Sequence, residues 1–340
     1  MGQTFEETWQ LLQEQGVLAH LQADATWSPN ALTLPVAPSE VFARSSQRPG
    51  TGDVTLPAAE ASAGKVTRPM TAVESLPPVP LVSGGPGSGD VLDLEELRPL
   101  GAGGMGEVLL AEQHSLHRKV AIKRLLSTLP KPSRDHAARL LLEEARLTGG
   151  LEHPNIVPVH LLDFGDEGRP RLVMKRLEGV AWRELIRQPG HPAWAHLRGD
   201  PLTRHIQILM QVCNAVEYAH SRRVIHRDIK PANVMVGSFG EVYLVDWGIA
   251  LDLSSHQRGT TPEVAGTPSY MAPEMLEGDL RADERTDVYG LGTVLYEALC
   301  GRAPFGGETA VDTLLDVIER DPDRKSTRLN LQSRFGISYA

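Results

Sequence analysis

The chain has 340 residues, and at roughly 150 residues per domain this length allows two domains at most. A hydrophobic fraction of 41% and a charged fraction of 23% are typical of globular proteins, and the net charge of −9 argues against a general nucleic-acid-binding protein. No run of about 18 apolar residues occurs, and the acidic, polar first residues do not resemble a signal peptide. Two cysteines cannot form a disulfide framework, so we expect reduced thiols and a cytoplasmic chain without a membrane segment.

Residues 1–90 differ in composition from the rest of the chain. They hold 10 of the 25 prolines, and 76–90 read as an extended and then flexible linker. We expect a mostly disordered, Pro/Gly-rich N-terminal extension. Only residues 5–22 show helical spacing, with Phe5, Trp9 and Leu12 on one stripe. This segment is either an amphipathic helix that frays without a partner or a small docking helix, and its spacing fits both.

After Leu94 the pattern changes to short strands followed by longer helices. This order predicts an α+β protein in which a β-rich part precedes an α-rich part. The expected strands are 107–113, 119–126 and 171–177, and the expected helices are 136–150, 202–223 and 288–301.

Residues 188–201 are expected to form a loop inserted between two helices, because they are rich in proline and glycine. Three histidines lie in or near this segment: His191, His196 and His205. Their spacing does not match a metal site, so we expect them to be solvated.

Residues 100–108, LGAGGMGEV, contain Gly101, Gly103 and Gly106 in the spacing G-x-G-x-x-G. Glycines allow a tight turn and bring backbone N–H groups close to phosphate oxygens. A dinucleotide-binding fold uses the same pattern to open a helix, whereas here a strand follows, which predicts a hairpin. Taken alone, the pattern also fits a plain hairpin turn.

The segment VAIK, 120–123, places Ala121 and Lys123 on one face of a strand. A buried lysine needs a counter-charge, because an unpaired buried ammonium is costly. Glu144 on the helix 136–150 is the best candidate partner, and Glu143 is its competitor. Without that context, Lys123 also fits an exposed strand lysine.

The strongest signal is VIHRDIKPANVMV, 224–236, followed by an apolar strand and the tripeptide DWG. Asp228 can accept a proton from a hydroxyl group. Asn233 and Asp246 can hold Mg²⁺, a hard cation that prefers oxygen ligands. We interpret His226 as a core residue that braces the loop and not as a base.

Together the ordered motifs GAGGMG, VAIK, a helix glutamate, HRDIKPAN, DWG, GTPSYMAPE and TDVYGLG resemble the protein kinase superfamily, and more narrowly the bacterial Ser/Thr kinases of eukaryotic (Hanks) type. The resemblance implies a bilobal α+β fold over residues 91–322, with a β-rich N-lobe, an α-rich C-lobe, and ATP and Mg²⁺ bound in the cleft. It implies transfer of the ATP γ-phosphoryl group to Ser or Thr hydroxyls of protein substrates.

The resemblance also implies a set of site residues. The catalytic residues would be Asp228, Lys230, Asn233 and Thr267, and the metal ligands Asn233 and Asp246. The nucleotide-binding residues would be Leu100, Gly101, Gly103, Gly106, Val108, Ala121, Lys123, Glu144, Met174, Lys175 and Leu177. Met174 would limit the back of the adenine pocket, although a plain core role also fits it. Asp287 would tether the backbone of the catalytic loop, and Trp247 stands where the family usually has phenylalanine.

Regulation and partners follow from the same resemblance. Arg227 precedes the catalytic carboxylate, and such a site is often completed by a phosphate on the activation loop, for which we expect Thr261 first and Thr260 second. The resemblance allows a kinase dimer for trans-autophosphorylation. A pseudokinase scaffold and a small-molecule phosphotransferase are the alternatives. The intact Lys123 and Asp228 disfavour the first, and GTPSYMAPE disfavours the second.

The C-terminal residues depart from the family pattern. Residues 308–322 predict a helix, but 323–340 have no helical period and resemble a translated sequencing adapter. We therefore expect a truncated kinase whose C-lobe lacks its last helices and leaves Glu274 as a buried charge without its arginine partner. A full-length form could be membrane-tethered.

Overall fold

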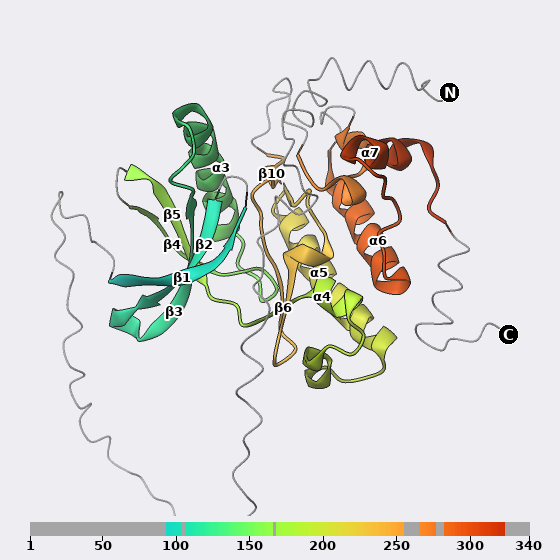
Figure 1. Ribbon diagram of the computed structural model, residues 1–340, viewed down its shortest axis with the longest axis horizontal. Helices are drawn as coiled ribbons and strands as arrows, with labels where there is room; N and C mark the ends of the chain where they lie inside the picture. Colours follow the sequence, from blue (N-terminus) through green and yellow to red (C-terminus); the bar gives the residue numbers. More distant parts are fainter. Residues whose placement is uncertain (1–92, 104–105, 166–167, 255–264, 277–281, 324–340) are drawn as a thin grey trace, which may run out of the picture.

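The computed structural model describes residues 93–103, 106–165, 168–254, 265–276 and 282–323. The expectations for the extension 1–90, for Thr260 and Thr261, and for the tail after Asp323 concern residues outside these ranges. Within them the chain forms two lobes, a β-sheet with one long helix and a helical lobe beside it (Figure 1).

A five-stranded antiparallel sheet forms the N-terminal lobe, in the order β1-β2-β3-β5-β4. Its strands are β1 (Leu94–Ala102), β2 (Gly106–Gln113), β3 (Arg118–Leu125), β4 (Val159–Phe164) and β5 (Pro170–Lys175). Alternation along β3 divides its side chains between two faces. Val120 and Ile122 are fully buried and pack in a cluster with Val173 of β5.

Helix α3 (Lys131–Gly149) packs on the other face of the sheet. Ala137, Leu141 and Ala145 recur every four residues, form one apolar stripe and are buried in a cluster with Leu172. The helix begins five residues before the predicted start at 136. Its first turn contains a proline, which the first turn tolerates because the missing N–H would have no helical partner there.

The C-terminal lobe is helical, with short β-ladders on the side that faces the sheet (Figure 1). Its helices are α4 (Trp182–Arg187), α5 (Pro201–Ser221), α6 (Glu284–Cys300) and α7 (Ala310–Glu319). Its strands are β6 (Gly179–Ala181), β7 (Val224–Ile225), β8 (Val234–Gly237), β9 (Val242–Leu244) and β10 (Leu251–Asp252). Its short 3₁₀ helices are Pro192–His196, Pro231–Asn233, Pro268–Tyr270 and Pro273–Met275, and a further one, His114–Leu116, lies between β2 and β3 of the N-terminal lobe. A large core containing Trp182, Ile208 and Trp247 joins α4, α5, α6 and the strands β6 to β9.

The predicted α+β, bilobal class is confirmed, and the β-rich part precedes the α-rich part as expected. Strands β1 and β4 were not predicted. Most residues of β1 are exposed, and β1 and β4 are the two edges of the sheet, so neither shows a strong apolar alternation. No described helix is both long enough and apolar enough to cross a membrane.

The expectation of solvated histidines around 188–201 is wrong for two of the three. His205 lies on α5, is 3% exposed, and accepts a hydrogen bond from the indole nitrogen of Trp182 at 2.9 Å. The buried His191 accepts from the backbone N–H of Ala193 at 3.1 Å and caps a 3₁₀ helix. Only His196 is exposed. Trp194 from the loop packs against His205, and loop composition alone does not indicate such packing.

The expectation that Glu274 is buried is also wrong, whereas the expectation that it lacks its arginine partner depends on the chain after Asp323 and stays a prediction. Its side chain is half-buried and accepts a hydrogen bond from the hydroxyl of Thr286 at 2.8 Å. Thr286 is in the first turn of α6, whose N-terminus favours a nearby carboxylate.

Candidate active site

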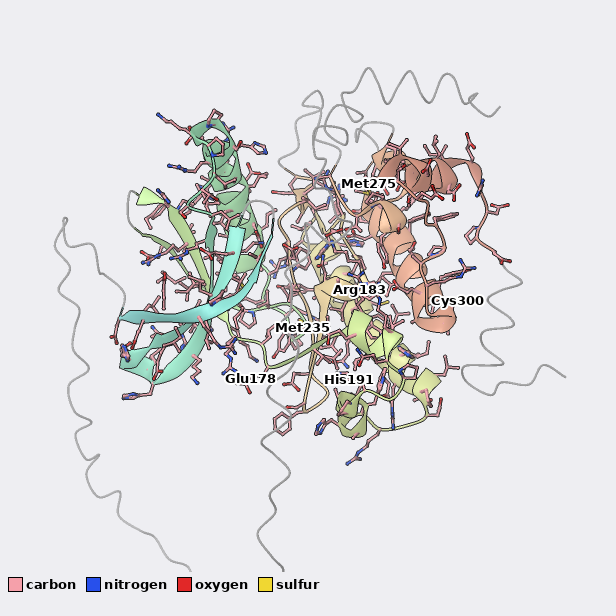
Figure 2. All side chains as sticks on the ribbon, viewed as in Figure 1. Glu178, Arg183, His191, Met235, Met275 and Cys300 are labelled. Carbon is pink, nitrogen blue, oxygen red and sulfur yellow. The ribbon has the colours of Figure 1, made fainter. Side chains whose placement is uncertain are left out.

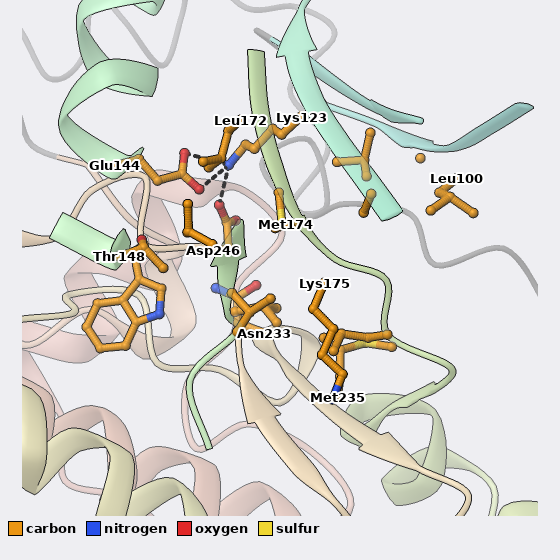
Figure 3. Close-up of a pocket in the computed structure, with 18 of the residues that line it drawn as sticks. Leu100, Lys123, Glu144, Thr148, Leu172, Met174, Lys175, Asn233, Met235 and Asp246 are labelled. Atoms are coloured by element: carbon orange, nitrogen blue, oxygen red, sulfur yellow. Dashed lines mark hydrogen bonds and ion pairs between the residues drawn. The ribbon is translucent and has the colours of Figure 1, made fainter. Parts of the chain in front are cut away.

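A cavity of about 150 Å³ lies between the sheet and the C-terminal lobe (Figure 3). It brings together most of the residues predicted for nucleotide and metal binding. These are Leu100, Gly101, Val108, Ala121, Lys123, Glu144, Met174, Lys175, Leu177, Asn233 and Asp246. The sheet provides its roof, and β8 with the following loops provides its floor.

Gly103 and Gly106 do not line the cavity and lie in the hairpin between β1 and β2 above it. The N–H of Gly103 donates to the carbonyl of Gly106 at 2.7 Å, which closes the turn. A Cβ atom on Gly106 would lie 2.8 Å from the carbonyl oxygen of Arg124, so this position requires glycine for close strand packing.

Eight further residues line the cavity and were not among the predicted site residues: Thr148, Val157, Val159, Leu172, Ala232, Met235, Val245 and Trp247. Most are apolar side chains on strands or next to motif residues. Met235 could have been found from alternation along VMV, because it lies two residues after Asn233 in the floor strand. The apolar wall suits a planar heterocycle, with polar groups concentrated at one end.

Lys123 is at the polar end of the cavity, where it contacts two carboxylates (Figure 3). Its ammonium donates to the two carboxylate oxygens of Glu144 at 2.7 and 2.8 Å and to Oδ1 of Asp246 at 3.0 Å. Glu144 is therefore the partner on α3, and not Glu143. The three residues come from β3, α3 and the DWG loop, so one ammonium joins both lobes.

Burial and charge act in opposite directions on this cluster. Burial alone would lower the pKa of Lys123, but Asp246 and Glu144 raise it above its usual value, so the ammonium stays protonated at neutral pH. Burial alone would raise the pKa of Asp246, but Lys123 and Lys230 lower it, so this carboxylate stays ionised. Burial raises the pKa of Glu144 against the opposing charge of Lys123.

Asp228 lies at the centre of a second network of hydrogen bonds. Its carboxylate accepts from the ammonium of Lys230 at 2.5 Å, from the hydroxyl of Thr267 at 2.9 Å and from the amide nitrogen of Asn233 at 2.9 Å. Lys230 also donates to Thr267 at 2.6 Å. All four predicted catalytic residues are therefore in one contact group, and the carboxylate is held in a fixed orientation.

Asp287 of α6 holds the loop that carries Asp228. Its carboxylate is 1% exposed and accepts from the backbone N–H groups of His226 at 2.8 Å and Arg227 at 2.9 Å. His226 is fully buried, and its ring accepts from the N–H of Asp228 at 3.2 Å. The loop geometry thus depends on side chains that lie behind it.

We expect Asp287→Ala to lower the free energy of unfolding by about 2–4 kcal/mol, because each buried N–H group left without an acceptor costs about 1–3 kcal/mol. Denaturant unfolding followed by circular dichroism measures this. The exposed Asp321→Asn is the matched control and should change stability by less than about 0.5 kcal/mol. Equal stability of the two variants would contradict the tethering role of Asp287.

Asn233 and Asp246 offer a donor set that fits Mg²⁺. The amide nitrogen of Asn233 donates to the carboxylate of Asp228, so the amide oxygen points away from Asp228. One carboxylate oxygen of Asp246 binds Lys123, and the group is ionised. An amide oxygen and a carboxylate lining one cleft suit a hard cation.

Two residues in these loops have left-handed backbone conformations. Arg227 and Asp246 both have φ of 65°, which is unfavourable for residues other than glycine. Such conformations concentrate at functional sites, where surrounding contacts hold them. Beside Asp246, the neighbouring Trp247 is 1% exposed and shares a core cluster with Leu147 of α3. Its ring lies against that of His226, with centroids 4.5 Å apart and the two planes tilted by 57°.

The two lobes, the glycine-rich hairpin between β1 and β2, and the cluster of Lys123 with two carboxylates define a phosphotransferase cleft of the kinase class. The family model described as the protein kinase domain matches residues 94–333. The chain belongs to this family.

Bacterial members of the family are similar to this chain. Serine/threonine-protein kinase PknB of Mycobacterium tuberculosis is 37% identical over 239 residues, which cover 67% of this chain and 36% of the relative. Serine/threonine-protein kinase PrkC of Bacillus subtilis is 37% identical over 228 residues, covering 66% of this chain and 33% of the relative. The chain thus spans about a third of the length of these curated relatives.

Proposed function

We propose that this chain is a protein serine/threonine kinase that transfers the γ-phosphoryl group of ATP, with Mg²⁺, to Ser or Thr hydroxyls of protein substrates. The observation that carries the proposal is the pair of networks in one cleft. Lys123, Glu144 and Asp246 provide a charged cluster for the nucleotide phosphates, and Asp228 is held next to it by Lys230 and Thr267.

Each residue has a defined task in this proposal. Lys123, held by Glu144, binds the α- and β-phosphates of ATP. Asn233 and Asp246 would hold Mg²⁺, which would neutralise phosphate charge. The hydroxyl oxygen of the substrate attacks the γ-phosphorus, and Asp228 accepts the proton of that hydroxyl. The bond between the γ-phosphorus and the oxygen that bridges it to the β-phosphate breaks, which releases ADP. The protein contributes positioning and electrostatic stabilisation more than covalent chemistry.

The acceptor preference rests on Lys230 and Thr267. Both contact Asp228, so a hydroxyl that approaches this carboxylate also comes close to the ammonium of Lys230. The names of the relatives PknB and PrkC support the same acceptor class. Backbone groups of Lys175 and Leu177 would meet the adenine edge, next to Met174 at the back of the cavity.

Incubation with radiolabelled ATP, Mg²⁺ and a generic basic protein tests the function. We expect label on phosphoserine and phosphothreonine and none on phosphotyrosine, with loss of transfer when EDTA removes the metal. Label on small alcohols but not on protein would favour a small-molecule phosphotransferase. Binding of ATP without any transfer would favour a non-catalytic scaffold.

Activation-loop autophosphorylation at Thr261, and secondarily at Thr260, is part of this proposal. Both lie outside the described residues. Arg227, whose Nε donates to the carbonyl of Ile249 at 2.7 Å, places a cation where the loop leaves the DWG segment. A phosphate paired with a guanidinium can order such a loop. Phosphopeptide mapping of active protein should find Thr261 or Thr260 occupied, and an active protein with both unmodified would contradict the assignment.

We also propose the extent and setting of the catalytic unit. Residues 91–322 would form the kinase domain after an N-terminal extension, and two kinase domains could meet for phosphorylation in trans. The domain would act in the cytoplasm, which holds ATP and keeps thiols such as the free Cys213 and Cys300 reduced.

A further inference from the structure

A second cavity, of about 490 Å³, lies outside the active site on the connection between the lobes. Three segments enclose it: the end of the β2–β3 turn with Lys119, the connection 175–179, and the β8–β9 turn with Phe239. Figure 2 shows Glu178 and Met235, two of its lining residues, near the junction of the lobes. Lys175, Leu177 and Met235 also line the nucleotide cavity, so the two cavities share a wall.

Three cations and two carboxylates line this second cavity, which gives it a net charge of +1. Lys119 and Lys175 are exposed, and Arg176 pairs with Glu178 at 2.5 Å. The remaining lining carboxylate, Glu241, accepts from a backbone N–H in the β8–β9 turn at 2.9 Å. Glu112 lies opposite Lys119 in the strand register, whereas Lys175 contacts Tyr243 and forms no ion pair with a carboxylate of the described residues.

Lys175 also acts on His160 of β4, which does not itself line the cavity. Burial lowers its pKa, and the charges of Arg118 and Lys175 lower it further. Lys175 lies over the ring of Tyr243, with its ammonium 4.6 Å from the ring centroid, and also donates to the tyrosine hydroxyl. The cation is thus held at the cavity wall.

An apolar contact point lies beside these cations. Phe239 is 94% exposed, the highest value among the exposed large hydrophobic residues of the described chain. With Tyr243 and Leu177 it gives the cavity aromatic and apolar surface next to positive charge. This combination fits a peptide segment that carries both carboxylates and aromatic side chains.

We propose that the second cavity binds residues 5–24 of this same chain. This segment carries Glu6, Glu7, Glu14 and Asp24 beside the apolar stripe of Phe5 and Trp9, and residues 1–40 contain no lysine or arginine. The other half of the extension contains all four of its basic residues. This proposal favours the interpretation of 5–22 as a docking helix and names the surface that it would bind.

The described chain begins close to this cavity. The carbonyl of Asp93 accepts from the N–H of His114, in the same β2–β3 connection that supplies His117 and Lys119 to the cavity. About 70 residues separate this segment from Asp93, and a random coil of that length has a root-mean-square span of about 45 Å, enough to reach the cavity at high effective concentration.

Zero-length carbodiimide cross-linking of the full 340-residue chain tests the docking. A mixture of ¹⁴N- and ¹⁵N-labelled copies identifies links within one chain by mass spectrometry. We expect links from Lys119 or Lys175 to carboxylates of 5–24 within one copy, with the exposed Lys131 at background. The yield should fall when NaCl is raised from about 50 mM to about 500 mM.

A variant that keeps all lysines and carboxylates available for cross-linking distinguishes docking from chance contact. Phe239→Ser removes the apolar contact without removing a lysine or carboxylate, and we expect it to lower the yield about threefold or more. Phe164→Ser, at a 55% exposed site on β4, is the matched control and should not change it. Links mainly between copies, no links to 5–24, or equal yields in the two variants would each overturn the proposal.

Discussion

The variant Asp228→Asn should lose phosphoryl transfer and still bind nucleotide. A positioned general base typically contributes about 10²- to 10⁴-fold to the rate. Because the amide of the variant does not accept the hydroxyl proton, we expect kcat to decrease by about 10²- to 10⁴-fold. Asp228 contacts Lys230, Thr267 and Asn233 but not Lys123, so the phosphate-binding cluster stays in place.

Single-turnover transfer measures the first effect, and equilibrium binding of ATP·Mg²⁺ measures the second. The exposed Asp135→Asn is the matched control and should retain full activity. Turnover of Asp228→Asn at more than a few percent of the parent would refute its catalytic role. Loss of nucleotide binding together with turnover would show that the residue acts on the cleft as a whole.

The variant Lys123→Met should reduce transfer by about 10²- to 10³-fold, because it removes a preorganised charge from the phosphate site. It should also destabilise the fold. Glu144 is 7% exposed, and without Lys123 it and Asp246 lose their shared cation. Breaking a buried ion pair in this way costs about 3–5 kcal/mol.

A second variant separates these two effects. Lys123→Met combined with Glu144→Gln removes one of the two carboxylates left behind, so we expect stability to recover in part in thermal unfolding while transfer stays low. The exposed Lys131→Met should match the parent in both measurements. Recovery of transfer in the double variant would contradict the assignment of Lys123 to the phosphates.

Much of the site could be predicted from sequence because its residues belong to short motifs with local geometry. The spacing in LGAGGMGEV indicated a hairpin, and the alternation in VAIK directed Ala121 and Lys123 to one face, where both line the cavity. The motif HRDIKPAN keeps Asp228, Lys230 and Asn233 within five residues, so their contacts follow from local chain geometry.

The tertiary structure alone decided the features that depend on distant segments. The choice of Glu144 over Glu143 required the rotation of α3 over the sheet, and Trp247, beside the left-handed backbone of Asp246, packs in the core. His205 became a core residue because Trp182 and Trp194, from separate segments, close over it. Sequence periodicity reports which face of an element is apolar, whereas packing between elements decides which neighbour satisfies each buried polar group.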